Sequence, residues 1–122
     1  MDQLFSLKSA GFILDLTPSE VLVLCRKSEV SIYHVGDSKR ITESGLRSLI
    51  SQSSADSFEI PQFLSLTRSA KLLDISTKTL RRLIDSNKLD VYRVGSRIRL
   101  KMSDLSLLII KRKSIDDYDF RL

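Results

Sequence analysis

The chain has 122 residues, a formal net charge of +5 and a single cysteine, Cys25. One cysteine excludes an intramolecular disulfide framework and fits a reducing compartment, so we expect a cytoplasmic protein. The longest apolar stretch near the start, GFILDL, is too short and too interrupted for a membrane span or a secretory signal. These features exclude a secreted disulfide-rich domain and predict no contact with a membrane.

The sequence contains an internal similarity at an offset of 59 residues. YHVGDSKRITESGLRSLI begins at Tyr33, and YRVGSRIRLKMSDLSLLI begins at Tyr92. Without a gap, residues 4–50 align with residues 63–109. The identical pairs include Ser6 with Ser65, Leu14 with Leu73, Asp15 with Asp74, Leu24 with Leu83, Val35 with Val94, Gly36 with Gly95 and Arg40 with Arg99. We interpret the pattern as a duplication that produced two small lobes.

This interpretation divides the chain into a first lobe at residues 1–50, a linker at 51–61, a second lobe at 62–113 and an acidic tail at 114–122. Lobes this small have marginal cores, so we expect them to pack on each other or on a second chain. Residues 1–50 carry six Lys or Arg and six Asp or Glu, whereas residues 63–113 carry thirteen and four, a net charge of +9. This partition indicates that only the second lobe meets a polyanion.

The first lobe contains a helix with a strong start signal. Thr17, Pro18 and Glu20 combine a capping box with proline at the first helical position. The inward positions are apolar and follow helical spacing: Val21, Leu24 and Cys25. The outward positions are Ser19, Leu22 and Val23. Because an exposed leucine and valine form an apolar patch, and such patches usually mark interfaces, we predict that these three outward residues contact protein.

The second lobe begins with two short helices. In LTRSAKLLDIS, Thr67 can cap the first helix, the DIS segment at 74–76 breaks it, and Ser76 caps the next helix. That helix has Leu80, Leu83 and Ile84 on one face. Its remaining surface carries hydroxyls and cations: Thr77, Lys78, Thr79, Arg81 and Arg82. Two helices joined by a short turn predict a helix-turn-helix whose second helix contacts DNA.

The period of the sequence then changes from helical to alternating. Gly95 and Ser96 predict a tight hairpin turn. On the return strand cations alternate with apolar residues, so we expect one face to pack and the other to form a row of cations. The cations of this wing, expected to contact phosphate or the minor groove, are Arg93, Arg97, Arg99 and Lys101. Ser103 is expected to cap a last helix, with Asp104 in its first turn and KRK at 111–113 near its end.

The stretch LTRSAKLLDISTKTLRRLIDSNKLDVYRVGSRIRLKMSDL resembles the excisionase-type branch of the MerR-like winged helix-turn-helix proteins. The landmarks are the SLTRSAKLLDIS opening, the YRVGSRIRL wing and the SDL start of the final helix. The resemblance reaches the first lobe only through the repeat. It implies an α+β, mainly α, fold of tandem winged helix-turn-helix lobes, each with a helix-turn-helix, a β-hairpin wing and a final helix.

We therefore predict sequence-specific binding of double-stranded DNA, with the helix at 77–85 in the major groove and the wing on the adjacent backbone or minor groove. An excisionase-like architectural factor in DNA recombination and a transcriptional regulator are both open. The alternatives are a DNA-binding antitoxin subunit that autoregulates its operon and a protein-interaction adaptor without specific DNA binding. Besides DNA, the first lobe is expected to bind a second copy of the chain or another protein. This function places the protein with the nucleoid in the cytoplasm.

The sequence offers no set of residues for catalysis. A Ser/His/Asp set, paired carboxylates and a phosphate-binding glycine loop are all missing, and His34 has no Cys or acidic cluster at ligand spacing. Cys25 is expected to be a small core residue. We predict neither enzymatic activity nor a cofactor or metal site.

Overall fold

The computed structural model describes residues 2–51 and 60–110. In the first half (residues 2–51) the elements are β1 (Leu4–Ser6), α1 (Leu7–Leu14), α2 (Pro18–Lys27), β2 (Tyr33–Val35), β3 (Ser38–Thr42), α3 (Glu43–Ser48) and β4 (Ile50–Ser51). In the second half (residues 60–110) they are β5 (Phe63–Ser65), α4 (Leu66–Leu73), α5 (Thr77–Asn87), β6 (Tyr92–Val94), β7 (Arg97–Lys101) and the 3₁₀ helix η1 (Met102–Leu108). Most of the expected linker, the KRK segment and the acidic tail lie outside the described residues.

The fold is α+β, with helices and two small antiparallel sheets. The helices and strands of the two halves follow one another in the same order, and their bounds agree at a constant offset of 59 residues. When 59 is added to the bounds of β1, α1, β2 and β3, the results are the bounds of β5, α4, β6 and β7. α2 and α5 also begin at equivalent residues, Pro18 and Thr77. A common origin of the halves by duplication stays an interpretation of the sequence.

Two helix starts follow the local sequence as predicted. The Thr17 hydroxyl accepts a hydrogen bond from the Glu20 backbone N–H, and the Glu20 carboxylate accepts one from the Thr17 N–H, so the capping box is present. The Ser76 hydroxyl accepts from the Thr79 N–H at the start of α5. Each bond satisfies a backbone donor that the first helical turn leaves without a partner.

Two other predicted caps are wrong. α4 begins after Ser65 instead of Thr67, because Ser65 still has an extended backbone and its hydroxyl accepts from the N–H of the third helical residue. Ser103 does not cap the last helix, which begins at Met102 with Lys101 at the cap position, two residues earlier than predicted. Thr42, the equivalent of Lys101, does cap α3 through its hydroxyl. A lysine side chain has no acceptor, so η1 begins without a side-chain cap.

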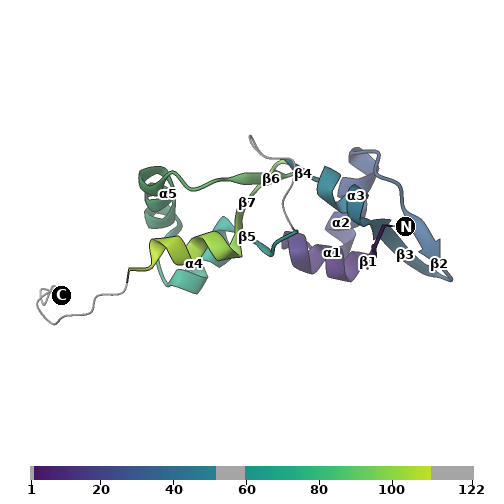
Figure 1. Cartoon of the computed structure of the whole chain (residues 1–122), viewed down its shortest axis with the longest axis horizontal. Helices are drawn as coiled ribbons and strands as arrows, with labels where there is room; N and C mark the ends of the chain where they lie inside the picture. The colour runs from purple at the N-terminus through teal and green to yellow at the C-terminus, as the bar shows by residue number, and fades with distance from the viewer. Residues whose placement is uncertain (1, 52–59, 111–122) are drawn as a thin grey trace, which may run out of the picture.

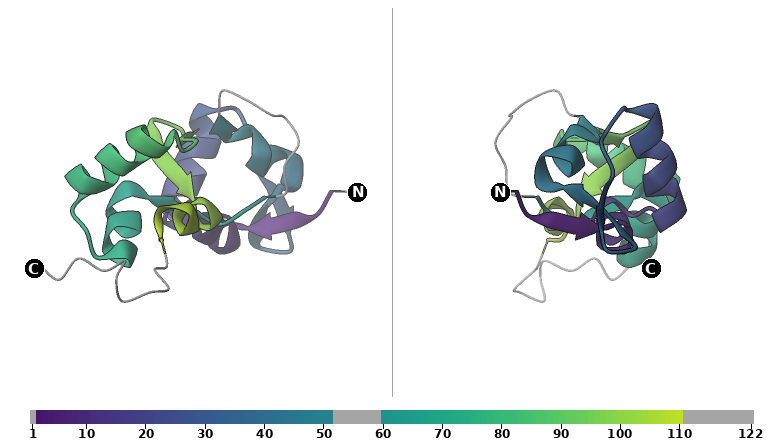
Figure 2. Two further views of the ribbon diagram at one scale, coloured as in Figure 1. Left: turned by 60° about the vertical axis from the view of Figure 1, so that its left-hand side comes forward. Right: turned by 90° about the vertical axis from the view of Figure 1, so that its right-hand side faces the viewer.

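The sheets bring the second-half hairpin to the middle of the molecule. The first sheet has the order β1-β3-β2, and the second has the order β4-β6-β7-β5. β4 leaves the first half and pairs with β6, with Ile50 opposite Val94. The β6–β7 hairpin therefore lies between the two groups of helices, whereas the β2–β3 hairpin forms the end of the molecule farthest from α5 (Figure 1). Turned by 60°, the purple-to-blue first half and the green-to-yellow second half lie side by side (Figure 2).

The hydrophobic core has two parts. One cluster combines residues of the first half, such as Leu14 and Val21, with Phe63, Tyr92 and Val94 of the second half. The Phe63 and Tyr92 rings meet edge-on, with centroids 5.3 Å apart. The other cluster contains second-half residues alone: Leu64, Ala70, Leu80, Ile84, Leu100 and Leu105. The halves therefore pack on each other through the strands of the second one.

An arginine of the wing is buried in this contact. Arg99 is 5% exposed. Its Nε donates to the Leu14 carbonyl at 2.7 Å and its Nη2 to the Asp15 carbonyl at 2.9 Å. These carbonyls lie at the C-terminal end of α1, where the last turn lacks intrahelical partners and the helix dipole is negative. Arg99 thus caps a helix of the other half, and the prediction that it faces solvent in a row of cations is wrong.

Asp15 joins the halves through its side chain as well. Its carboxylate accepts from the Ser65 N–H at 3.0 Å and from Nη1 of Arg68 at 2.6 Å. Burial alone would raise the pKa of Asp15, but the hydrogen bonds from Ser65 and Arg68 together hold that pKa below its usual range. The ionised carboxylate is therefore the form that the contact between the halves stabilises.

Arg99→Ala should destabilise the protein far more than Arg40→Ala at the equivalent position. Removing Arg99 leaves two carbonyls in the contact without their charged donor, which we expect to lower the free energy of unfolding by about 2–4 kcal/mol. Arg40 is half-buried and donates to the Lys39 carbonyl, so its loss should change that free energy by about 0.5 kcal/mol or less. Urea unfolding followed by circular dichroism measures both. Equal losses would contradict the role of Arg99.

Acid should weaken the contact between the halves. The pKa of Asp15 is lower in the folded chain than the value of about 3.9 in an unfolded one. Its contribution is therefore complete above about pH 4 and disappears as the pH falls through the folded-state pKa. We expect the urea midpoint of the natural chain to fall more steeply below about pH 4 than that of Asp15→Asn, because asparagine has no carboxylate to protonate. Asparagine is a suitable replacement because it tolerates the left-handed backbone at this position. Parallel pH profiles would show that the carboxylate does not couple to folding.

Candidate nucleic-acid interface

The second half contains a helix pair with an exposed second helix. α4 ends at Leu73 and is followed by Asp74, which has a left-handed backbone, and α5 begins after the Ser76 cap. Leu80 and Ile84 of α5 are buried in the second-half cluster. Their burial fixes which face of α5 is turned to the solvent, because positions three and four apart share one side of a helix.

The solvent face of α5 is cationic. Lys78, Arg81 and Arg82 are exposed, as is Thr77, and Thr79 is half-buried. Among residues 2–51 and 60–110, no acidic side chain forms an ion pair with any of the three cations. The structure therefore brings together on one helix all five residues that the sequence analysis assigned to DNA contact there. A helix face with this charge, and with no counter-ion among the described residues, attracts phosphate.

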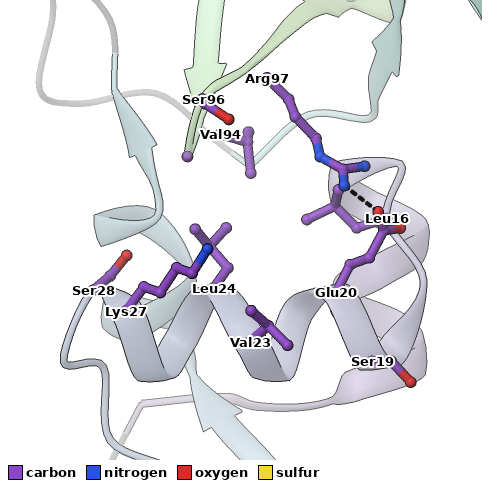
Figure 3. Close-up of a pocket in the computed structure, with 11 residues that line it drawn as sticks. Leu16, Ser19, Glu20, Val23, Leu24, Lys27, Ser28, Val94, Ser96 and Arg97 are labelled. Atoms are coloured by element: carbon purple, nitrogen blue, oxygen red, sulfur yellow. Dashed lines mark ion pairs between the residues drawn. The ribbon is translucent and has the colours of Figure 1, made fainter.

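The four assigned cations of the wing do not form a single row. Arg93 is exposed on β6. Arg97 forms an ion pair with Glu20 of α2 (Figure 3). Lys101 is half-buried, with its ammonium 5.1 Å from the centre of the Tyr92 ring. Because Arg99 is bonded to the end of α1, a phosphate contact at that position would require the contact between the halves to open.

The outward face of α2 borders a pocket of about 500 Å³ at the tip of the second-half wing (Figure 3). Ser19 and Val23 line the pocket on the helix side, and Val94 and Gly95 line it on the wing side. Val23 is 48% exposed, and Leu22 is half-buried and does not line the pocket. Two of the three residues predicted to contact protein therefore border the pocket beside the wing of their own chain, and both stay exposed. A partner from another chain stays a prediction.

Glu20 is a partner of the wing that was not predicted from the sequence, although the sequence contains a signal for it. The ion pair joins Glu20 to Arg97. At an offset of 59 the equivalent of Glu20 in the second half is Thr79, and the equivalent of Arg97 in the first half is Ser38. Both equivalents are uncharged. A reciprocal change of this kind indicates contact between two positions of the repeat.

Comparison with known families places the second half. Residues 63–113, somewhat less than half of the chain, match the family model described as a helix-turn-helix domain. Residues 63–113 are a helix-turn-helix domain. The comparison finds no match among curated proteins or solved structures. The helix-turn-helix domain indicates DNA as the partner and is of a typically non-enzymatic kind. The excisionase branch stays a prediction.

The described residues add two further findings. No helix within residues 2–51 and 60–110 is long and apolar enough to cross a membrane. In the same ranges no three or more His, Cys, Asp or Glu side chains gather where they could hold a metal ion.

The contact between the wing tip and α2 can be tested with two glycines of the same conformation. Gly95 and Gly36 have φ values of 64° and 62°. A Cβ at Gly95 would lie 2.9 Å from Cδ1 of Leu24, whereas a Cβ at Gly36 would meet nothing within 4 Å. Both alanine variants suffer the same backbone strain, so Gly95→Ala should lose about 1 kcal/mol more unfolding free energy than Gly36→Ala, because the end of the Leu24 side chain has to move aside. Thermal unfolding of the two variants measures the difference, and equal stabilities would place the wing tip away from α2.

Proposed function

We propose that this protein binds double-stranded DNA by placing α5 in the major groove. The observation that carries the proposal is the exposed face of α5, with Lys78, Arg81 and Arg82 unpaired among the described residues. The matched helix-turn-helix domain supports the same conclusion. In this motif the second helix enters the major groove, where arginine and lysine side chains reach base edges and phosphates.

The other candidate residues differ in how available they are for contact with DNA. Thr77 and Thr79 supply hydroxyls near the N-terminus of α5, where hydroxyls and backbone N–H groups can donate to phosphate. Arg93 is exposed and available to the adjacent backbone. Arg97 would have to exchange Glu20 for a phosphate. Arg99 holds the halves together through its bonds to Leu14 and Asp15, so the proposal assigns it no DNA contact.

For the biological role, we propose a sequence-specific factor of the excisionase-like architectural kind or a transcriptional regulator. The adaptor alternative has one observation in its favour, the exposed apolar side chains Tyr33 and Val35 on the first-half wing. That alternative gives no reason for the cations on α5. An antitoxin that autoregulates its operon would use α5 in the same way, and footprinting on the DNA upstream of the gene distinguishes a single operator from several adjacent sites.

The salt dependence of binding tests the proposal. If α5 and Arg93 together neutralise about three or four phosphates, log K should fall with log salt at a slope of about −3 to −4. Arg81→Ala and Arg82→Ala should each weaken binding by about 1–3 kcal/mol if the side chain reaches a base edge. A residue that touches only phosphate should instead weaken all sequences alike and reduce the slope by about one. Fluorescence anisotropy with the full chain and a duplex measures both quantities.

Lys39→Ala is the matched control, because it removes one positive charge from the exposed surface of the first half. This variant should leave the slope and the affinity nearly unchanged. If Lys39→Ala weakens binding as much as Arg81→Ala, the interaction depends on overall charge and not on α5. A slope near zero in the natural chain would favour the adaptor.

A further inference from the structure

The contact between the two halves joins two different surfaces. We define the wing surface of the second half as Gln62, Phe63, Ser65, Arg68, Tyr92, Val94, Gly95, Arg97 and Arg99. We define the helix-end surface of the first half as Phe12, Leu14, Asp15, Glu20 and Leu24. The wing surface donates its hydrogen bonds to the helix-end surface, as Arg99 does to Leu14 and as Gln62 does to the Phe12 carbonyl at 2.5 Å. The contact is therefore heterologous.

Each half has both surfaces at equivalent positions, so one of each is left over. The first half has a wing surface made by β1, β2 and β3, and the second half has a helix-end surface made by α4 and α5. The β2–β3 hairpin and α5 lie at opposite ends of the molecule (Figure 1). No intramolecular contact can join surfaces at opposite ends, but a second copy of the chain can.

The left-over wing surface has the chemistry of the one that is buried. Six of its nine residues are identical: Gln3, Ser6, Tyr33, Val35, Gly36 and Arg40 stand at the positions of Gln62, Ser65, Tyr92, Val94, Gly95 and Arg99. Tyr33 and Val35 are 50% and 54% exposed, whereas Tyr92 and Val94 are each 1% exposed. Nη1 of Arg40 donates to the preceding carbonyl, as Nη1 of Arg99 does. The same side chains are thus presented without a cover.

The left-over helix-end surface matches it. Leu73, Asp74 and Leu83 stand at the positions of Leu14, Asp15 and Leu24. Asp74 has φ 54° and ψ 49°, and Asp15 has φ 57° and ψ 51°, so the two helix ends present their carbonyls alike. Of the two ion pairs in the contact, Glu20 with Arg97 would be replaced by the uncharged Thr79 and Ser38. Asp15 with Arg68 would be replaced by Asp74 and Ser9, so the Asp74 carboxylate would have the Ser6 N–H and the Ser9 hydroxyl as donors in place of a guanidinium.

A strand position completes the match. In the sheet order β1-β3-β2, strand β2 has one neighbour, whereas its equivalent β6 has two, β7 and β4. β4 begins at Ile50, whose equivalent is Ile109 at the end of the second half. Ile109 and Ile110 are both exposed and follow η1 without belonging to a strand. Residues 109–110 of one copy are therefore placed to pair with the open edge of β2 in another.

We propose that copies of this chain associate head to tail, with the first-half wing of one copy on α4 and α5 of the next. The association would repeat between chains the contact that already exists within the chain. A heterologous contact does not close on itself at the dimer, so the product is an open series or a ring. Val23 stays 48% exposed beside the bound wing, and its equivalent Arg82 would keep a similar reach to DNA.

Sedimentation of the full chain without DNA tests the proposal. The average mass should rise with concentration and pass the dimer. Val35→Glu places a charge where its equivalent is almost completely buried, and it should weaken association by about tenfold to a hundredfold. Met102→Glu is the control: Met102 is exposed, lies outside both surfaces and has a glutamate, Glu43, as its equivalent. It should associate like the natural chain.

A gain of association provides a test that misfolding cannot imitate. Ser38→Arg with Thr79→Glu recreates between chains the ion pair of Arg97 and Glu20, and Thr79→Glu also forms a capping box with Ser76. The double variant should associate about twofold to fivefold more tightly than the natural chain. The proposal would be overturned if the average mass stayed at the monomer or reached a plateau at the dimer. It would also be overturned if Val35→Glu and Met102→Glu had equal effects, or if the double variant did not associate more tightly. None of these results bears on DNA binding by α5, which the salt dependence tests separately.

Discussion

The bonds from Arg99 to the end of α1 determine how the molecule is assembled. They fix β7 against the first half, and the hairpin that contains β7 then lies along α2. This position brings Arg97 to Glu20 and the tip at Gly95 to Leu24. A guanidinium suits this task because its fork of N–H donors can reach two carbonyls at once, and because the C-terminal end of a helix favours a cation.

Using the wing as an internal clamp changes what is left for DNA. In the resemblance drawn from the sequence, helix and wing share the contact with the duplex. Here Tyr92, Val94 and Arg99 are buried in the contact between the halves. In the proposed complex with DNA, the electrostatic attraction then depends mainly on α5, whose cations Lys78, Arg81 and Arg82 have the uncharged equivalents Ser19, Leu22 and Val23 in α2. The first half supplies the surface that the wing needs and adds no net charge of its own.

The sequence predicted the features that depend on local patterns. The capping box at Thr17, the hairpin glycines and the inward positions of both second helices follow from neighbouring residues, and the structure agrees with them. The fate of Arg99 could not be read in this way. Arg40 and Arg99 occupy the same place in the same motif, yet only Arg99 is buried, because a partner more than eighty residues away covers it. Alternation along a strand indicates which side chains share a face, but it does not tell what covers that face.

The two clusters of the core differ in which half supplies their residues, and this difference sets the order in which the two halves can unfold locally. The first-half cluster includes Phe63, Tyr92 and Val94 from the other half, whereas the second-half cluster contains no residue of the first. Opening of α1 and α2 therefore leaves α4 and α5 with their own packing intact. Opening of the second half withdraws side chains on which the first half depends. Amide hydrogens of the first half then exchange through two routes, their own local opening and that of the helix-turn-helix domain, and the slowest-exchanging amides lie in the second half.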